Sequence, residues 1–147
     1  MARTLGVHHI INKAYPSLAF EGEWKEVFGC PSDPFTMLVY GLPKNGKTNF
    51  MMKFSKYLTQ FGKVWYNSIE EGDCLTIKEA FIRCRMDELE PGKFMMGDRY
   101  FFQDMVEYLK GRNKGKFVII DSRDFINLTC QQFKKLKTLF PVVICFQ

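Results

Sequence analysis

The sequence has no long hydrophobic run and no paired cysteines. None of its apolar stretches approaches the ~20 residues that a transmembrane helix needs, and the apolar part of "MARTLGVHHIINKAYPSL" is too short and broken for a signal peptide. Its five cysteines are an odd number and include no C-x-x-C pair, which argues against both a disulfide framework and a zinc site. We therefore expect a soluble, cytoplasmic protein that does not associate with a membrane.

A strong excess of one charge is also missing. The 21 basic and 16 acidic residues leave a net charge of +5, which permits contact with a polyanion without requiring it. A chain of 147 residues that is 46% hydrophobic can bury one core. We expect a single domain over residues 1–147, in which residues 1–34 form an N-terminal arm packed on the rest.

A regular pattern begins at residue 35. Four short runs rich in β-branched and aromatic residues predict strands, at 35–40, 63–68, 116–121 and 142–146, and the "KFMMG" stretch at 93–97 suggests a further short one. The runs are mostly continuous rather than alternating, which is typical of strands buried on both faces. The sequence therefore predicts a sheet covered on both sides.

Helical segments alternate with these strands. They are predicted at 46–61, which Gly62 ends, from a Thr76/Glu79 capping box onward, at 99–111 with Asp98 as cap, and from a Thr129/Gln132 capping box to Phe140. Strands that alternate with helices indicate right-handed crossovers and a mainly parallel sheet. The predicted fold is a three-layer α/β/α sandwich.

The segment "GLPKNGKT" carries the main functional signal. It matches G-x-x-x-x-G-K-[ST] and stands between a predicted strand and a predicted helix, which is the context this phosphate-binding loop requires. Average residue usage gives on the order of 0.005 accidental matches in a chain of this length. The predicted nucleotide contacts are Gly41, Leu42, Pro43, Lys44, Asn45, Gly46, Lys47, Thr48 and Asn49.

Each residue type suits a task in this loop. Gly41 lets the chain leave the strand sharply, and Gly46 lets backbone N–H groups at the helix start approach phosphate oxygens. Lys47 would reach the β- and γ-phosphates of ATP, and the Thr48 hydroxyl would bind Mg²⁺. Asn45 can tolerate a left-handed conformation within the loop. ATP and Mg²⁺ are the expected cofactors.

A second metal ligand is expected at Asp121. This residue ends the apolar stretch "FVIID", where an uncompensated buried charge would be costly, so a cation nearby would stabilise it. The alternative is that Asp121 caps the turn that follows.

Glu70 and Glu71 follow the second predicted strand. Strands of one polarity end at the same edge of a parallel sheet, so Gly41, Glu70, Asp121 and Gln147 are expected at one crevice. A carboxylate there could orient a water toward the γ-phosphate, and Gln147 could sense that phosphate. Glu70 is slightly favoured over Glu71 because it is nearer the strand. The alternative is that "EEGD" is a solvated acidic loop.

Together, "GLPKNGKT", "NSIEEGD", "VIIDS" and "VVICFQ" resemble the RecA-like branch of the P-loop NTPases in order and spacing. The resemblance implies a Walker A loop, a catalytic glutamate, a Walker B aspartate at Asp121 and a polar sensor at Gln147. It also implies that the phosphate-loop strand lies beside the fourth strand, with the Walker B strand next and the second strand outermost. The glutamate doublet is most similar to KaiC, and the wider pattern resembles compact ATPases of bacteriophages and mobile elements.

The resemblance implies ATP hydrolysis in DNA recombination, repair or replication, with single-stranded DNA and further copies of the chain as partners. Relatives continue beyond the position of Gln147 with DNA-contacting loops and a further strand, so we expect a C-terminally truncated or minimal core. Two rival functions stay open. One is a nucleotide or small-molecule kinase that uses arginines such as Arg83, Arg85 and Arg99, and the other is a nucleotide-gated binding module with little turnover.

Overall fold

A computed structural model describes residues 2–42, 44–111, 115–121, 127, 129–140 and, for the backbone alone, 142–146. The chain divides into two compact units, Met1–Pro34 and Phe35–Gln147. The predicted contacts of Pro43 and Gln147 lie outside the described residues.

The N-terminal unit contains two short helices. Helix α2 (Gly22–Phe28) has the sequence GEWKEVF, and its Trp24 and Phe28 rings stack with centroids 6.2 Å apart. Helix α1 (Val7–Ile11) was not predicted, because its five residues show no sustained period and its N-cap, Gly6, offers no side chain. An isolated antiparallel bridge joins Ser17 to Ser32.

The second unit is built on a five-stranded parallel sheet. Its strands are β1 (Thr36–Val39), β2 (Val64–Ser68), β3 (Phe94–Asp98), β4 (Phe117–Asp121) and β5 (Val142–Phe146), in the order β1-β5-β4-β2-β3. The predicted neighbours β1, β5, β4 and β2 are confirmed. The placement of the second strand at the outer edge is wrong, because the short strand β3 pairs with β2 and takes that position.

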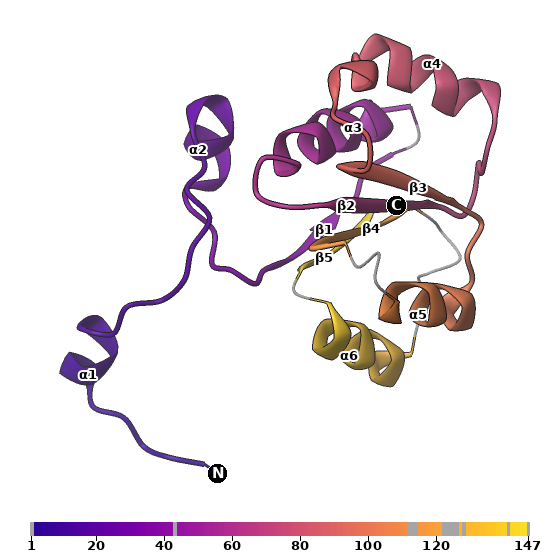
Figure 1. The fold of residues 1–147 in the computed structure, drawn as a ribbon. Helices are drawn as coiled ribbons and strands as arrows, with labels where there is room; N and C mark the ends of the chain where they lie inside the picture. The colour runs from indigo at the N-terminus through magenta and orange to yellow at the C-terminus, as the bar shows by residue number, and fades with distance from the viewer. Residues whose placement is uncertain are drawn as a thin grey trace. The chain divides into compact units, whose positions relative to one another are not determined.

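Helices cover both faces of this sheet (Figure 1). Helices α3 (Lys47–Leu58) and α4 (Leu75–Arg83), with the short 3₁₀ helix η1 (Met86–Glu88), lie on one side, and α5 (Phe102–Lys110) and α6 (Cys130–Leu139) lie on the other. Alternate residues of β2 and β4 pack into the α5/α6 layer, where Trp65, Val118 and Ile120 are buried beside Met105 and Leu136. The predicted α/β sandwich is confirmed.

Three predicted helix ends are wrong. Helix α3 ends at Leu58 with Thr59 as its cap, before Gly62. Helix α4 begins at Leu75 after an extended Cys74, so Thr76 lies inside the helix and forms no capping box. Asp98 ends β3, and Phe101 is the N-cap of α5. The Thr129/Gln132 capping box of α6 is confirmed, with both reciprocal hydrogen bonds present.

Strand β1 also departs from the predicted burial. It pairs on one side only, with β5, and its residues alternate between exposed and half-buried, so that Leu38 is 66% exposed. This continuous apolar run therefore forms an edge strand, and not a strand buried on both faces as predicted. Of the helices the structure describes, none is long and apolar enough to cross a membrane.

Candidate functional site

The carboxyl ends of the strands meet in one row along an edge of the sheet. Asp121 of β4 lies opposite Ser68 of β2 on one side and Phe146 of β5 on the other, and Phe146 lies opposite Val39 of β1. Ser68 lies opposite Asp98 of β3. The loops that begin at residues 40, 69 and 99 therefore leave the sheet at the same edge.

The phosphate loop connects β1 to α3 with two left-handed residues. Gly46, the N-cap of α3, has φ 73°, and Lys44 has φ 66°. The left-handed conformation that Asn45 was expected to tolerate is therefore adopted by its neighbour, Lys44. No atom lies within 4 Å of a Cβ built on Gly46, so the backbone angle, rather than crowding, calls for glycine at this position in the ligand-free loop.

The start of α3 presents unused hydrogen-bond donors. Gly46 has no side chain to cap the helix, and the amides of Thr48 and Asn49 have no hydrogen-bond partner in the described part of the chain. The Lys47 ammonium donates to the carbonyl oxygens of Gly41 and Leu42, each at 2.8 Å, and so sits within the loop. Open amides and a cation at a helix N-terminus are a seat for an anion.

Asp121 is a buried carboxyl group, only 9% exposed. Burial raises its pKa from the usual value of 3.8 to about 6, a hydrogen bond from Tyr66 lowers it, the charges of Glu71 and Glu70 raise it, and the Lys47 ammonium lowers it. Lys47, Glu70 and Glu71 therefore lie close enough to Asp121 for their charges to act on it. A cation near Asp121 would offset the repulsion from the Glu71 and Glu70 charges.

The residues present fit a magnesium ion bound together with a phosphate ligand. Mg²⁺ is usually held by one or two carboxylates, a hydroxyl and substrate phosphates rather than by a cage of protein ligands. Thr48 and Asp121 supply such oxygen ligands. The described residues contain no group of three or more His, Cys, Asp or Glu side chains that could hold a metal alone.

The loop that carries Glu70 and Glu71 is fastened to its neighbours by backbone and side-chain bonds. The amide of Ile69 donates to the Asp121 carbonyl at 3.0 Å, and the Gly72 amide donates to Ser68 Oγ at 3.0 Å. The Glu70 side chain is exposed and that of Glu71 is half-buried, and Glu71 has the larger effect on the pKa of Asp121. The choice between them as the residue that orients water stays open.

The turn after β3 closes on this loop. Arg99 donates from a terminal guanidinium nitrogen to the Glu71 carbonyl at 2.8 Å, and the Asp98 carboxylate accepts from the Asp73 amide at 3.1 Å. Arg99 has φ 54°, a strained angle for a residue with a side chain. Gly72, at φ 65°, lies so close that a Cβ there would stand 2.5 Å from Asp98 Oδ1.

The sequence reasoning missed the supporting role of Tyr66, Asp98 and Arg99. Tyr66 was assigned no role in the site, and Arg99 was considered only as an arginine that a kinase would use. The bonds that these residues make join different strands, so they depend on β-strand register rather than on a local motif. A polar residue at the end of each neighbouring strand was the one available signal.

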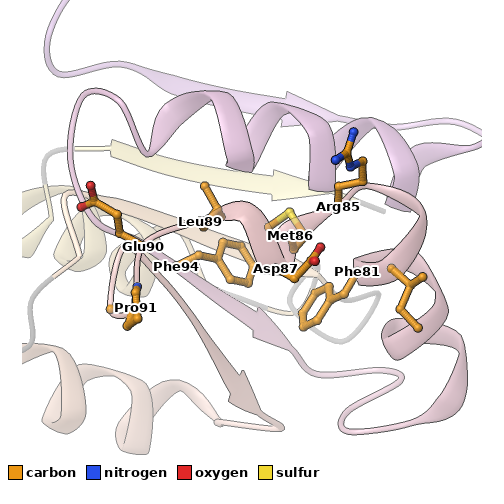
Figure 2. Close-up of a pocket in the computed structure, with 10 residues that line it drawn as sticks. Phe81, Arg85, Met86, Asp87, Leu89, Glu90, Pro91 and Phe94 are labelled. Carbon is orange, nitrogen blue, oxygen red and sulfur yellow. The ribbon is translucent and has the colours of Figure 1, made fainter.

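A cavity of about 630 Å³ lies away from this edge of the sheet. Figure 2 shows it between α4, η1 and the start of β3, lined by residues that include Phe81, Met86 and Phe94. Phe94 is the first residue of β3, so the cavity faces the amino ends of the strands. It is therefore separate from the phosphate loop and from Asp121.

The strand order and the helices on both faces give an α/β fold with a parallel sheet, as in the structures of RecA-like NTPases. A flagellar accessory protein, FlaH from Methanocaldococcus jannaschii, has a similar structure, with a TM-score of 0.61 at 14% sequence identity over 90% of this chain and 70% of that one. An ATP synthase subunit, NeqB from Nanoarcheaum equitans, is less similar, with a TM-score of 0.49 at 9% identity over 91% of this chain and 44% of that one. No protein-family model matches the sequence, and comparison with curated proteins gave no significant match.

Proposed function

We propose that the protein binds ATP together with Mg²⁺ and hydrolyses it. The observation that supports this most directly is the meeting of two opposite charge environments at one sheet edge. The open amides and the Lys47 ammonium suit the phosphates, and Asp121 with the adjacent glutamates suits a divalent cation. Each environment alone is common, and their combination on a RecA-like fold favours a nucleoside triphosphate with its metal.

The chain's own residues would divide the work of hydrolysis. Lys47 and the amides of Thr48 and Asn49 would stabilise the charge that develops on the phosphate oxygens. Glu70 or Glu71 would orient the attacking water, so that ADP and inorganic phosphate are the products. When bound, Mg²⁺ would neutralise phosphate charge, held by Thr48 and Asp121.

The kinase alternative would use arginines that have other partners here. The Arg83 Nε donates to Asn49 Oδ1 at 2.9 Å, Arg85 pairs with Glu88 at 2.6 Å, and Arg99 bonds to the Glu71 carbonyl. A lid arginine must be free to reach the transferred phosphate. Hydrolysis without an acceptor is therefore the favoured reaction.

A role on DNA stays a prediction from the sequence. Among the basic residues that could form a surface for DNA, Lys134, Lys135 and Lys137 lie on α6, on the opposite face of the sheet from α3 (Figure 1). The remaining basic residues considered are Arg83, Arg85, Lys110, Arg112, Lys114 and Lys116. Single-stranded DNA added to the hydrolysis assay tests this role, and an association of further copies of the chain is tested by measuring mass in solution with and without ATP.

Phosphate release from ATP and Mg²⁺, measured without any acceptor, tests the proposed function. Glu70→Gln and Glu71→Gln are compared, because the residue that orients water should lower kcat by about 100-fold or more while ATP binding persists. The other substitution should change kcat by only a few fold. If both variants keep the wild-type kcat, water is not oriented by this loop, and binding without any phosphate release in the wild type would favour the nucleotide-gated module.

A further inference from the structure

Tyr66 reaches the proposed metal ligand from the neighbouring strand. Tyr66 lies on β2 and pairs with Ile119 of β4, two positions before the pair formed by Ser68 and Asp121. Side chains two residues apart on a strand share one face, so the Tyr66 side chain lies on the same face as Asp121. Its hydroxyl donates a hydrogen bond to Asp121 Oδ2 at 2.7 Å.

The tyrosine is held rigidly. Its side chain is fully buried, and its ring packs against Phe94 of β3 with centroids 6.0 Å apart. The Phe94 ring in turn packs edge to face with the Phe81 ring on α4, with centroids 5.7 Å apart. The hydroxyl is therefore presented to Asp121 from a packed layer rather than from a mobile loop.

The bond uses one carboxylate oxygen and leaves the other available. Asp121 Oδ1 accepts no hydrogen bond from the described residues, and no fully buried side-chain oxygen or nitrogen among them lacks a partner. Oδ1 must therefore be reached by solvent. One oxygen fixed by a protein donor and one open to solvent is the arrangement expected of a carboxylate prepared for an outside ligand.

Burial, and then the neighbouring charge of Asp121, raise the pKa of the Tyr66 hydroxyl well above its usual range. The hydroxyl thus stays a donor at neutral pH. Phenylalanine would fill the same apolar space without a hydroxyl, so the hydroxyl of Tyr66 adds the bond to Asp121 to the packing of its ring.

We infer that Tyr66 is a positioning residue, which fixes Asp121 so that its free oxygen can bind Mg²⁺ when a nucleotide phosphate is present. It does not touch the substrate. This inference rests on the proposed function, because it presupposes that Asp121 is a metal ligand. Tyr66 would thereby increase the gain in ATP affinity that Mg²⁺ provides.

The test is the gain in ATP affinity that Mg²⁺ provides, measured by isothermal titration with Mg²⁺ and again with EDTA. Tyr66→Phe should bind ATP in EDTA like the wild type and should lose about tenfold of the Mg²⁺-dependent gain, since a hydrogen bond to a charged group is lost. A variant that merely loosened the core would weaken binding under both conditions. Tyr108→Phe is the matched control, because this half-buried tyrosine has no described hydroxyl bond, and it should behave as wild type.

Tyr66→Met is a second test variant, because it also removes the hydrogen-bond donor while it fills the apolar space. Thermal unfolding of each variant checks that it is folded. An unchanged Mg²⁺-dependent gain in both folded variants would overturn the inference. Asp121→Asn separates this failure from that of the proposed function. If Asp121→Asn abolishes the gain and Tyr66→Phe does not, only the role of Tyr66 is wrong, whereas a gain that survives Asp121→Asn removes the metal assignment itself.

Discussion

The two halves of the candidate site are built in opposite ways. The phosphate loop is open: Gly41, Lys44 and Gly46 are exposed, and among the described residues the Lys47 ammonium bonds only to carbonyls of its own loop. The half formed by β2, β3 and β4 is closed, with Asp121, Ser68 and Tyr66 buried. Tyr66 of β2 donates to Asp121 of β4, and Ser68 Oγ accepts from the Gly72 amide of the glutamate loop.

This difference means that ligand affinity and the free energy of unfolding depend on different halves of the site. An exposed group that bonds within its own loop contributes little to the free energy of unfolding. Such a group can exchange these bonds for bonds to a ligand at little cost to stability. A buried polar group contributes to stability through its partners, because losing one leaves an unsatisfied group in the interior. Changes in the open half should therefore alter ligand affinity, and changes in the closed half should alter the free energy of unfolding as well.

The largest effect is expected from the charge of Asp121 in the ligand-free protein. Its pKa of about 6 in the folded state lies above the usual 3.8, so between these values the folded state binds more protons than the unfolded one. The wild type should then lose stability as pH rises through this window, by about 3 kcal/mol in total. Asp121→Asn should escape this loss.

Urea unfolding in EDTA at about pH 4 and about pH 7 measures this effect. The advantage of Asp121→Asn over the wild type should grow with pH, while Asp104→Asn on the exposed face of α5 should follow the wild type. A constant difference between Asp121→Asn and wild type would mean that Asp121 is solvated like a surface residue, and the contrast between the halves would fail.

The open half should respond differently. Lys47→Ala removes the cation from the anion seat, so ATP affinity should fall by about 100-fold, while the free energy of unfolding changes by less than about 1 kcal/mol. Isothermal titration and urea unfolding measure the two quantities. Equal ATP affinity in both proteins would end the assignment of this loop to phosphate binding.

The sequence predicted where the open half lies, between a strand and a helix, because its signal is contiguous. The loop "GLPKNGKT" lies between a strand and a helix, and the structure has that order at Thr36–Val39 and Lys47–Leu58. The capping box at Thr129 and Gln132 is confirmed for the same reason, since both of its bonds are local. At Thr76 the same pattern failed because Cys74 takes the extended cap position and the helix starts before the threonine.

The closed half could be predicted only in outline. Parallel strands alone place Asp121 and the glutamate loop at one edge, but the Tyr66–Asp121 bond spans 55 residues and the Arg99–Glu71 bond spans 28. The first depends on the register of β2 with β4, and the second depends on the pairing of β3 with β2 at the outer edge. Neither register nor strand order is written in a local pattern.

A pair of glycines gives the smallest and sharpest comparison. At Gly72, φ is 65° and an added Cβ would lie 2.5 Å from Asp98 Oδ1 and 2.6 Å from Arg99 Cζ, so Gly72→Ala must push away the side chains that fasten the glutamate loop. Backbone strain and the lost bonds should cost about 2 kcal/mol. Phosphate release should fall with it, while ATP affinity stays close to that of the wild type.

Gly41→Ala is the matched variant in the open half. Its added Cβ would meet Lys47 Cδ at 3.8 Å, an ordinary contact, so stability should change by less than about 1 kcal/mol. Urea unfolding of both variants, with phosphate release measured in parallel, gives the comparison. If Gly72→Ala is as stable and as active as Gly41→Ala, then Asp98 and Arg99 do not hold the loop, and the closed half is no more constrained than the open one.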